Sequence, residues 1–139
     1  MQKVIIDTNV IVSSLIQKSY PYLIIYELVP EEKFHLCVSE KLMAEYYAVL
    51  ARPKFEKYQD FFIRAEALLI DIETYANSYF PTITVELISD KNDNWILELA
   101  DECRADFIIT GNTKDFTFST YKQTRIVTPK EYWEKYQPD

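Results

Sequence analysis

The strongest constraint on this chain lies in residues 4–12, Val-Ile-Ile-Asp-Thr-Asn-Val-Ile-Val, where a carboxylate interrupts the most apolar segment of the sequence. An ionised carboxylate that is removed from water costs several kcal/mol unless it is paired, hydrogen-bonded or bound to a cation. The fold must therefore bring compensating groups to Asp7. Polar residues elsewhere in the sequence that meet Asp7 are the first candidates for a functional site.

The length and composition indicate one globular domain. The chain has 139 residues, and 48% of them are hydrophobic, which is enough for one substantial core. We expect a single domain over residues 1–139. No apolar run approaches the ~20 residues of a membrane-spanning helix, and the N-terminus lacks the residue order of a signal peptide. We therefore expect a cytoplasmic protein with no membrane partner.

Several kinds of site are excluded or disfavoured by residue counts. The single glycine, Gly111, excludes phosphate-binding loops and dinucleotide fingerprints, which need several glycines close together. The single histidine, His35, lies in an apolar run and is a poor candidate for a nucleophilic triad. Cys37 and Cys103 lie far apart without a zinc-binding pattern, so we expect both to be reduced core residues.

The net charge of −7 argues against a protein that binds long nucleic acid by simple neutralisation of phosphates. It does not exclude a nuclease whose acidic residues surround metal ions, because bound cations reverse the local charge.

Hydrophobic periodicity and capping residues predict strands that alternate with helices. The expected strands cover residues 3–6, 34–38, 83–87, 107–109 and 125–127. The expected helices cover residues 10–17, 19–29, 40–51, 60–77 and 93–104, with a last one opened by the capping box at 128–131. This alternation indicates an α/β fold with a central, mostly parallel, five-stranded sheet flanked by helices.

Polar residues cluster where these strands end. Asp7 follows the first strand, Asn112 and Asp115 follow the fourth, and Asp93 opens the helix before the fourth. Ligands bind at the carboxyl edge of open α/β sheets, so we expect these side chains to meet there. Glu45 borders the apolar face of helix 40–51, and we expect it to face a polar or charged group within the fold.

Carboxylates that converge in one pocket repel each other unless a cation lies between them. A set of oxygen ligands suits Mg²⁺ or Mn²⁺, which can activate a water for attack on a phosphodiester. Each acid alone also has a structural explanation. Asp7 suits a helix cap as well as a ligand site. Glu45 alone is more often an acid at a helix edge, and Asp93 alone is more often a first-turn acid that interacts favourably with the helix dipole.

Together, these segments resemble the four motifs of the PIN-domain family. Residues 4–13 resemble its first motif, residues 38–45 its second, residues 90–100 its third and residues 105–112 its fourth. The sequence Leu-Ala-Arg-Pro-Lys-Phe at residues 50–55 is similar to the family branch that contains toxin components of toxin–antitoxin pairs.

This resemblance implies a three-layer fold and a Mg²⁺- or Mn²⁺-dependent ribonuclease that cleaves single-stranded RNA. It also implies a homodimer that an antitoxin protein holds inactive. Asp7, Glu45 and Asp93 carry over as metal ligands and catalytic residues. Many members have an aspartate where this chain has Asn112, and Asp115 is the candidate substitute three residues on; both complete the predicted catalytic set.

Basic residues near these motifs are candidates to steer phosphates toward the acids, although such residues are more often plain solvated side chains. They are Lys41, Arg52, Lys54 and Lys114. Two other functions compete with the nuclease. One is a catalytically weak PIN fold that serves as a nucleic-acid- or protein-binding module. The other is a phospho-accepting receiver domain, which this chain fits poorly because no acceptor aspartate ends its third strand.

Overall fold

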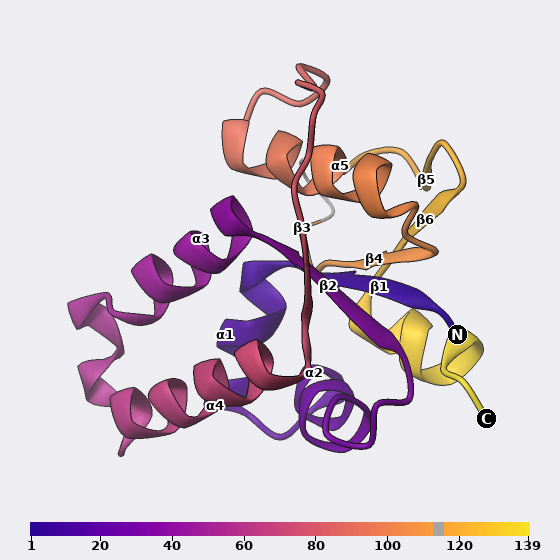
Figure 1. Ribbon diagram of the computed structural model, residues 1–139. Coiled ribbons are helices and arrows are strands. Elements are labelled where there is room, and N and C mark those ends of the chain that lie inside the picture. The colour runs from indigo at the N-terminus through magenta and orange to yellow at the C-terminus, as the bar shows by residue number, and fades with distance from the viewer. Residues whose placement is uncertain (113–115) are drawn as a thin grey trace.

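The computed structural model describes residues 1–112 and 116–139 and shows a six-stranded sheet with helices on both faces (Figure 1). The strand order is β3-β2-β1-β4-β6-β5. The strands are β1 (Lys3–Ile6), β2 (His35–Ser39), β3 (Asn77–Tyr79), β4 (Phe107–Ile109), β5 (Thr120–Tyr121) and β6 (Thr124–Val127).

The sheet is parallel except for its last pair. β1 lies between β2 and β4, β3 adds to β2, and β6 adds to β4, all in parallel, while β5 pairs with β6 in antiparallel orientation. In the register of β1 and β4, Ile6 lies opposite Ile109. Asp7 and Thr110, which follow these two strands, therefore lie side by side at the carboxyl edge of the sheet.

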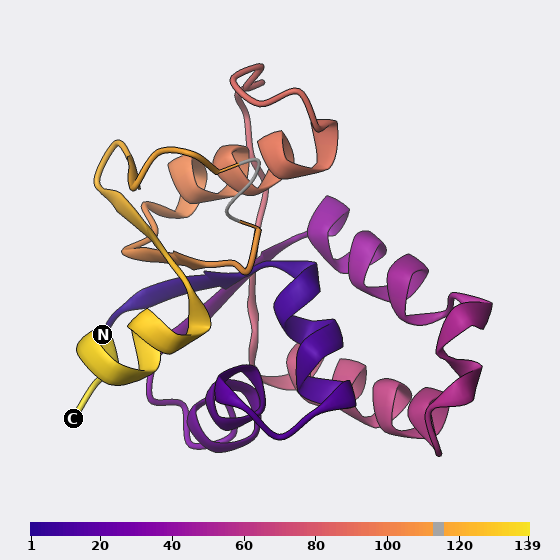
Figure 2. The same ribbon diagram turned by 180° about the vertical axis from the view of Figure 1, so that it is seen from behind.

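Two helical layers cover the sheet. Helix α5 packs on one side, against β1, β2 and β3, while α1, α2 and the C-terminal turns lie on the other side (Figures 1 and 2). Helices α3 and α4 form a pair beside α1. The helical elements are α1 (Thr8–Ile16), α2 (Tyr20–Leu23), the π-helical turn η1 (Ile24–Leu28), α3 (Glu40–Leu50), the 3₁₀ turn η2 (Pro53–Lys57), α4 (Phe61–Tyr75), α5 (Lys91–Cys103), α6 (Pro129–Glu131) and the π-helical turn η3 (Tyr132–Tyr136).

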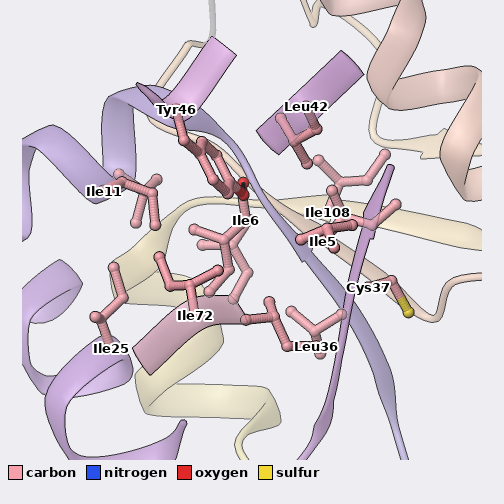
Figure 3. Close-up of a cluster of buried hydrophobic side chains, with 14 of the residues drawn as sticks. Ile5, Ile6, Ile11, Ile25, Leu36, Cys37, Leu42, Tyr46, Ile72 and Ile108 are labelled. Atoms are coloured by element: carbon pink, nitrogen blue, oxygen red, sulfur yellow. Dashed lines mark hydrogen bonds between the residues drawn. The ribbon is translucent and has the colours of Figure 1, made fainter. Parts of the chain in front are cut away.

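The core is built around β1. Val4, Ile5 and Ile6 are fully buried because helices cover both faces of a central parallel strand. Figure 3 shows Ile11 of α1 and Tyr46 of α3 among the buried side chains beside Ile6. The Tyr46 hydroxyl donates a hydrogen bond to the main-chain carbonyl of Ile6, which fixes α3 against the end of β1.

Side-chain caps begin α1, α3, α5 and α6, whereas α4 begins after Asp60 without one. Asp7 caps α1, Ser39 caps α3, Asp90 caps α5, and Thr128 forms a capping box with Glu131. Each cap accepts a hydrogen bond from a main-chain N–H that the helix itself leaves without a partner. For Asp7, capping is therefore part of the compensation for burial.

The predicted strand over residues 83–87 is wrong. The third strand is β3, directly after α4, and the main-chain groups of residues 83–87 do not join the sheet. Side chains of α5 bind this segment instead. The N–H of Val85 donates to Glu98, and the N–H groups of Leu87 and Ile88 donate to Asn94. Polar side chains of a neighbouring helix thus accept the main-chain hydrogen bonds that a neighbouring strand would otherwise accept.

The predicted fold class is confirmed as an α/β fold with a mostly parallel sheet, but the sheet has six strands instead of five. The additional strand, β5, is a two-residue edge strand that pairs with β6. Two residues give no measurable periodicity, which is why the sequence does not reveal it. Within the described ranges, no helix is long and apolar enough to cross a membrane.

Helix α4 supplies a matched pair for testing the core. Ile72 is 1% exposed and packs into the core, whereas Ile63 on the same helix is 72% exposed. We expect Ile72→Ala to lower the free energy of unfolding by about 2–5 kcal/mol, because it leaves a cavity. Ile63→Ala should change it by no more than about 0.5 kcal/mol. Urea denaturation of both variants measures this difference, and equal effects would contradict the packing of α4.

Candidate functional site

One cleft of about 430 Å³ collects most of the predicted site residues. Asp7 from the end of β1, Glu45 from α3, Asp93 from the first turn of α5 and Asn112 after β4 all line it. The fifth predicted residue, Asp115, lies outside the described residues. The carboxyl edge of the sheet therefore brings together side chains that are more than a hundred positions apart in sequence.

Asp7 is the most buried acid in this cleft, with 4% of its surface exposed. Its Oδ1 accepts a hydrogen bond from the N–H of Thr8 at 2.7 Å. Its Oδ2 accepts from the Thr110 hydroxyl at 2.7 Å and from the Asn9 amide at 3.1 Å. These donors are all neutral, so they satisfy the oxygens of Asp7 without cancelling its charge.

Burial therefore controls the ionisation of Asp7. The pKa of the Asp7 carboxyl is raised from 3.8 to about 6, mainly by desolvation and in smaller part by the nearby Glu45 carboxylate, while the hydrogen bonds from Thr110, Thr8 and Asn9 oppose the shift. A carboxyl with such a pKa interacts unfavourably with its surroundings when charged. A cation bound in the cleft would relieve this cost.

Glu45 meets polar groups on both sides of the cleft. Its Oε2 accepts from the Thr8 hydroxyl at 2.6 Å, and its Oε1 accepts from the Asn92 amide at 2.9 Å. Thr8 belongs to α1 and Asn92 to α5, so Glu45 bridges these two helices from its place on α3.

Asp93 and Asn112 form the other wall of the cleft. Asp93 is 7% exposed, and its Oδ2 lies 3.4 Å from the amide nitrogen of Asn112. The main-chain N–H of Asn112 also donates to the Thr110 hydroxyl at 2.9 Å. Because Thr110 in turn donates to Asp7, a continuous chain of hydrogen bonds runs from Asp93 to Asp7.

Besides Asn9, which donates to Asp7, three residues of this network were not predicted as site residues from the sequence. Thr8, Asn92 and Thr110 connect the acids by hydrogen bonds. Each is the direct sequence neighbour of a predicted acid or lies two residues from Asn112. Their proximity in sequence was the available signal, but which hydroxyl or amide meets which carboxylate depends on the packing of α1, α3 and α5.

Two of the predicted basic residues line the same cleft. Arg52 and Lys54 line it near η2, and the buried Phe55 lines it beside them. Lys41 lines a neighbouring pocket instead, and Lys114 lies outside the described residues. The cleft thus combines acids at its base with two cations at one end, an arrangement compatible with a phosphate-containing ligand.

The donor chemistry of the cleft fits Mg²⁺ or Mn²⁺. Three carboxylates and one amide oxygen are hard oxygen donors, and the described lining residues include neither histidine nor cysteine. Within residues 1–112 and 116–139, no three Asp, Glu, His or Cys side chains already form a group close enough to hold a metal ion. Thr8, Thr110 and Asn92 instead hydrogen-bond to oxygens of Asp7 and Glu45.

The fold and the cleft define an α/β protein with acidic residues at the carboxyl edge of a parallel sheet. The chain belongs to the PIN-domain family, since the family's sequence model, described as PIN domain, matches residues 3–114. The chain is also similar to the uncharacterized protein MJ1680 of Methanocaldococcus jannaschii, with 27% identity over 143 residues that cover 97% of this chain and 92% of the relative. PIN domains are typically metal-dependent nucleases, often in toxin–antitoxin pairs.

The raised pKa of Asp7 predicts a pH dependence of stability. A carboxyl whose pKa is higher in the folded protein stabilises the fold while protonated, and this contribution is lost as the pH rises through about 6. Asp7→Asn removes the titration. The free energy of unfolding of Asp7→Asn relative to wild type should therefore rise by about 2 kcal/mol between pH 4.5 and pH 7.5.

This difference is measured by urea denaturation at both pH values in EDTA. Asp71→Asn removes an exposed carboxylate on α4 and serves as the control, for which the difference should stay constant. A constant difference for Asp7→Asn as well would show that burial does not shift the ionisation of Asp7.

Proposed function

We propose that the chain is a Mg²⁺- or Mn²⁺-dependent endoribonuclease that hydrolyses phosphodiester bonds in single-stranded RNA. The observation that carries this proposal is the cleft in which Asp7, Glu45, Asp93 and Asn112 lie together. No covalent nucleophile is needed for such a reaction, because a metal-activated water can attack the phosphorus directly. Membership of the PIN-domain family supports the same conclusion.

The residues of the cleft divide into distinct roles. Asp7 and Asp93 hold the ion, and Glu45 positions the ion or the attacking water. Asn112 contributes an uncharged amide, and Asp115 is the fifth residue of the proposed catalytic set. Arg52 and Lys54 attract the phosphates of the strand to an otherwise acidic surface. The bound metal would supply the charge that stabilises the transition state.

We further propose that the protein is the toxin of a cytoplasmic toxin–antitoxin pair. The segment 50–55 that resembles the toxin branch forms the Arg52 and Lys54 end of the cleft. An antitoxin that covered this end would block access of RNA to the acids.

A specific observation favours a second candidate, the catalytically weak PIN fold that binds nucleic acid or protein. Asn112 lacks the charge of an aspartate, and the hydrogen-bonded acids do not form a ready-made group for a metal ion within the described residues. A weak metal site would leave the fold as a binding module.

The nuclease proposal predicts that the acids control cleavage. Asp7→Asn and Asp93→Asn should each lower Mg²⁺- or Mn²⁺-dependent cleavage of single-stranded RNA by roughly 100-fold or more, because each removes a ligand of the ion. A fluorophore–quencher RNA substrate measures the rate. Glu31→Gln, on an exposed loop outside the cleft, should cleave like wild type.

Calorimetric titration with Mn²⁺ separates the two candidates. The nuclease requires a site of millimolar affinity or tighter that Asp7→Asn loses. If wild type shows no such site, the binding module is correct. If Asp7→Asn cleaves RNA as fast as wild type in Mg²⁺, the assignment of the acids is wrong.

We also propose a homodimer that forms through the outer face of α3 and α4. Apolar side chains line a groove of about 460 Å³ between these helices, and two of them on α4, Phe62 and Ile70, are exposed. Exposed apolar side chains that cluster on one face are characteristic of contact surfaces.

Sedimentation velocity at micromolar concentration should show a dimer for wild type. Ile70→Glu places a charge in the groove and should give a monomer that remains folded, since Ile70 is 56% exposed on the single chain. Glu66→Gln, in the same groove, should remain dimeric. A wild-type protein that sediments only as a monomer would contradict the proposed homodimer.

A further inference from the structure

A second pocket, of about 280 Å³, lies at the start of α3. It is formed where the segment after β3 crosses α3 and α5. Its lining includes Lys41, Phe80, Ile83, Trp95 and Glu98. None of these residues belongs to the acidic cleft, and the proposed hydrolysis does not use them.

This pocket adjoins the cleft along two helices. Lys41 lies four residues, or about 6 Å along the axis, before Glu45 on α3. Trp95 lies three residues after Asn92 on α5, and Asn92 donates to Glu45 at 2.9 Å. Residues three or four apart share one helix face, so the pocket and the cleft are consecutive along the same surface.

The pocket contains an aromatic ring beside an ammonium group, the types of side chain on which single-stranded nucleic acids stack and bind. Lys41 Nζ lies 5.2 Å from the centre of the half-buried Trp95 ring, which is a cation–π contact. Phe80, on the rim, is 74% exposed although it is aromatic. An aromatic face with an adjacent ammonium group can stack a base and neutralise its phosphate.

Glu98 adds a hydrogen-bond acceptor to this pocket. It is 6% exposed, and its Oε2 accepts from the N–H of Val85 at 3.0 Å. Its Oε1 lies 4.0 Å from Lys41 Nζ, which is beyond hydrogen-bond distance. A carboxylate in this position can accept from the amino group of adenine, cytosine or guanine, whereas uracil has no amino group.

We propose that this pocket binds one base of single-stranded RNA next to the phosphate that is cleaved. The base stacks on Trp95 with Phe80 at its edge, Lys41 turns from the ring to the phosphate, and Glu98 accepts from the amino group of the base. The pocket thus favours amino-bearing bases over uracil. This inference rests on the proposed RNA substrate, but it concerns binding and not hydrolysis. The mixture of aromatic, ammonium and carboxylate groups fits a nucleotide better than an apolar protein segment.

Fluorescence of Trp95 tests the proposal directly. The chain has two tryptophans, so Trp133→Phe leaves Trp95 as the sole reporter. The added substitution Asp7→Asn keeps the RNA intact in the presence of Mg²⁺. We expect short oligoadenylate and oligocytidylate to quench the emission saturably, and oligouridylate to bind at least about 3-fold more weakly, since it lacks the amino group.

Variants on the otherwise wild-type chain separate binding from catalysis. Trp95→Leu should raise KM for cleavage by roughly 5- to 100-fold with little change in kcat, and Trp95→Tyr should restore most of the loss, because stacking on an aromatic ring contributes this much. Phe80→Ala and Lys41→Gln change exposed side chains and should raise KM without unfolding the protein. Ile63→Ala, on the far end of α4, serves as the control.

These experiments distinguish rejection of the base pocket from rejection of the proposed ribonuclease. Saturable quenching by RNA with no cleavage by wild type would retain the base pocket and reject the ribonuclease. Cleavage by wild type with unchanged Trp95 emission, and with unchanged KM in Phe80→Ala and Lys41→Gln, would overturn the base pocket and leave the ribonuclease in place.

Discussion

The burial of Asp7 at the end of the central strand is the constraint on which the rest of the structure depends. Its carboxylate joins three elements, because it caps α1, accepts from Thr110 after β4 and lies next to the Thr8 hydroxyl that binds Glu45 of α3. Neutral donors satisfy the oxygens of Asp7 but leave its charge in a desolvated site, which raises its pKa to about 6. The fold thus carries an energetic cost at this position that core packing must offset.

Much of this arrangement could be predicted because it depends on strand ends. In parallel strands with Ile6 opposite Ile109, the next residues must meet at one edge, and the sequence shows both strands clearly. The apolar run before Asp7 and the capping box at Thr128 are local signals that the structure reproduces. The fold class follows from the same signals.

The remaining features could not be predicted because contacts across the fold decide them. Residues 83–87 have the composition of a strand, yet Glu98 and Asn94 of α5 accept hydrogen bonds from the main-chain N–H groups of Val85 and Leu87. The same contacts bring this segment against Lys41 and Trp95, and so create the second pocket. In the sequence, Trp95 looks like an ordinary core residue of helix α5. Only the structure shows that the segment after β3 crosses it and forms the pocket.

Helix α3 unites the two pockets and supports the proposal that this acidic protein acts on RNA. Lys41 and Glu45 lie on one face, and Arg52 follows just beyond the last turn, so cations flank the carboxylates at both ends of the same surface. A strand laid along this face would meet Lys41, then the acids, then Arg52 and Lys54. Attraction at both ends and repulsion in the middle would hold the strand across the site, and the repulsion would be removed when a divalent cation binds between the acids.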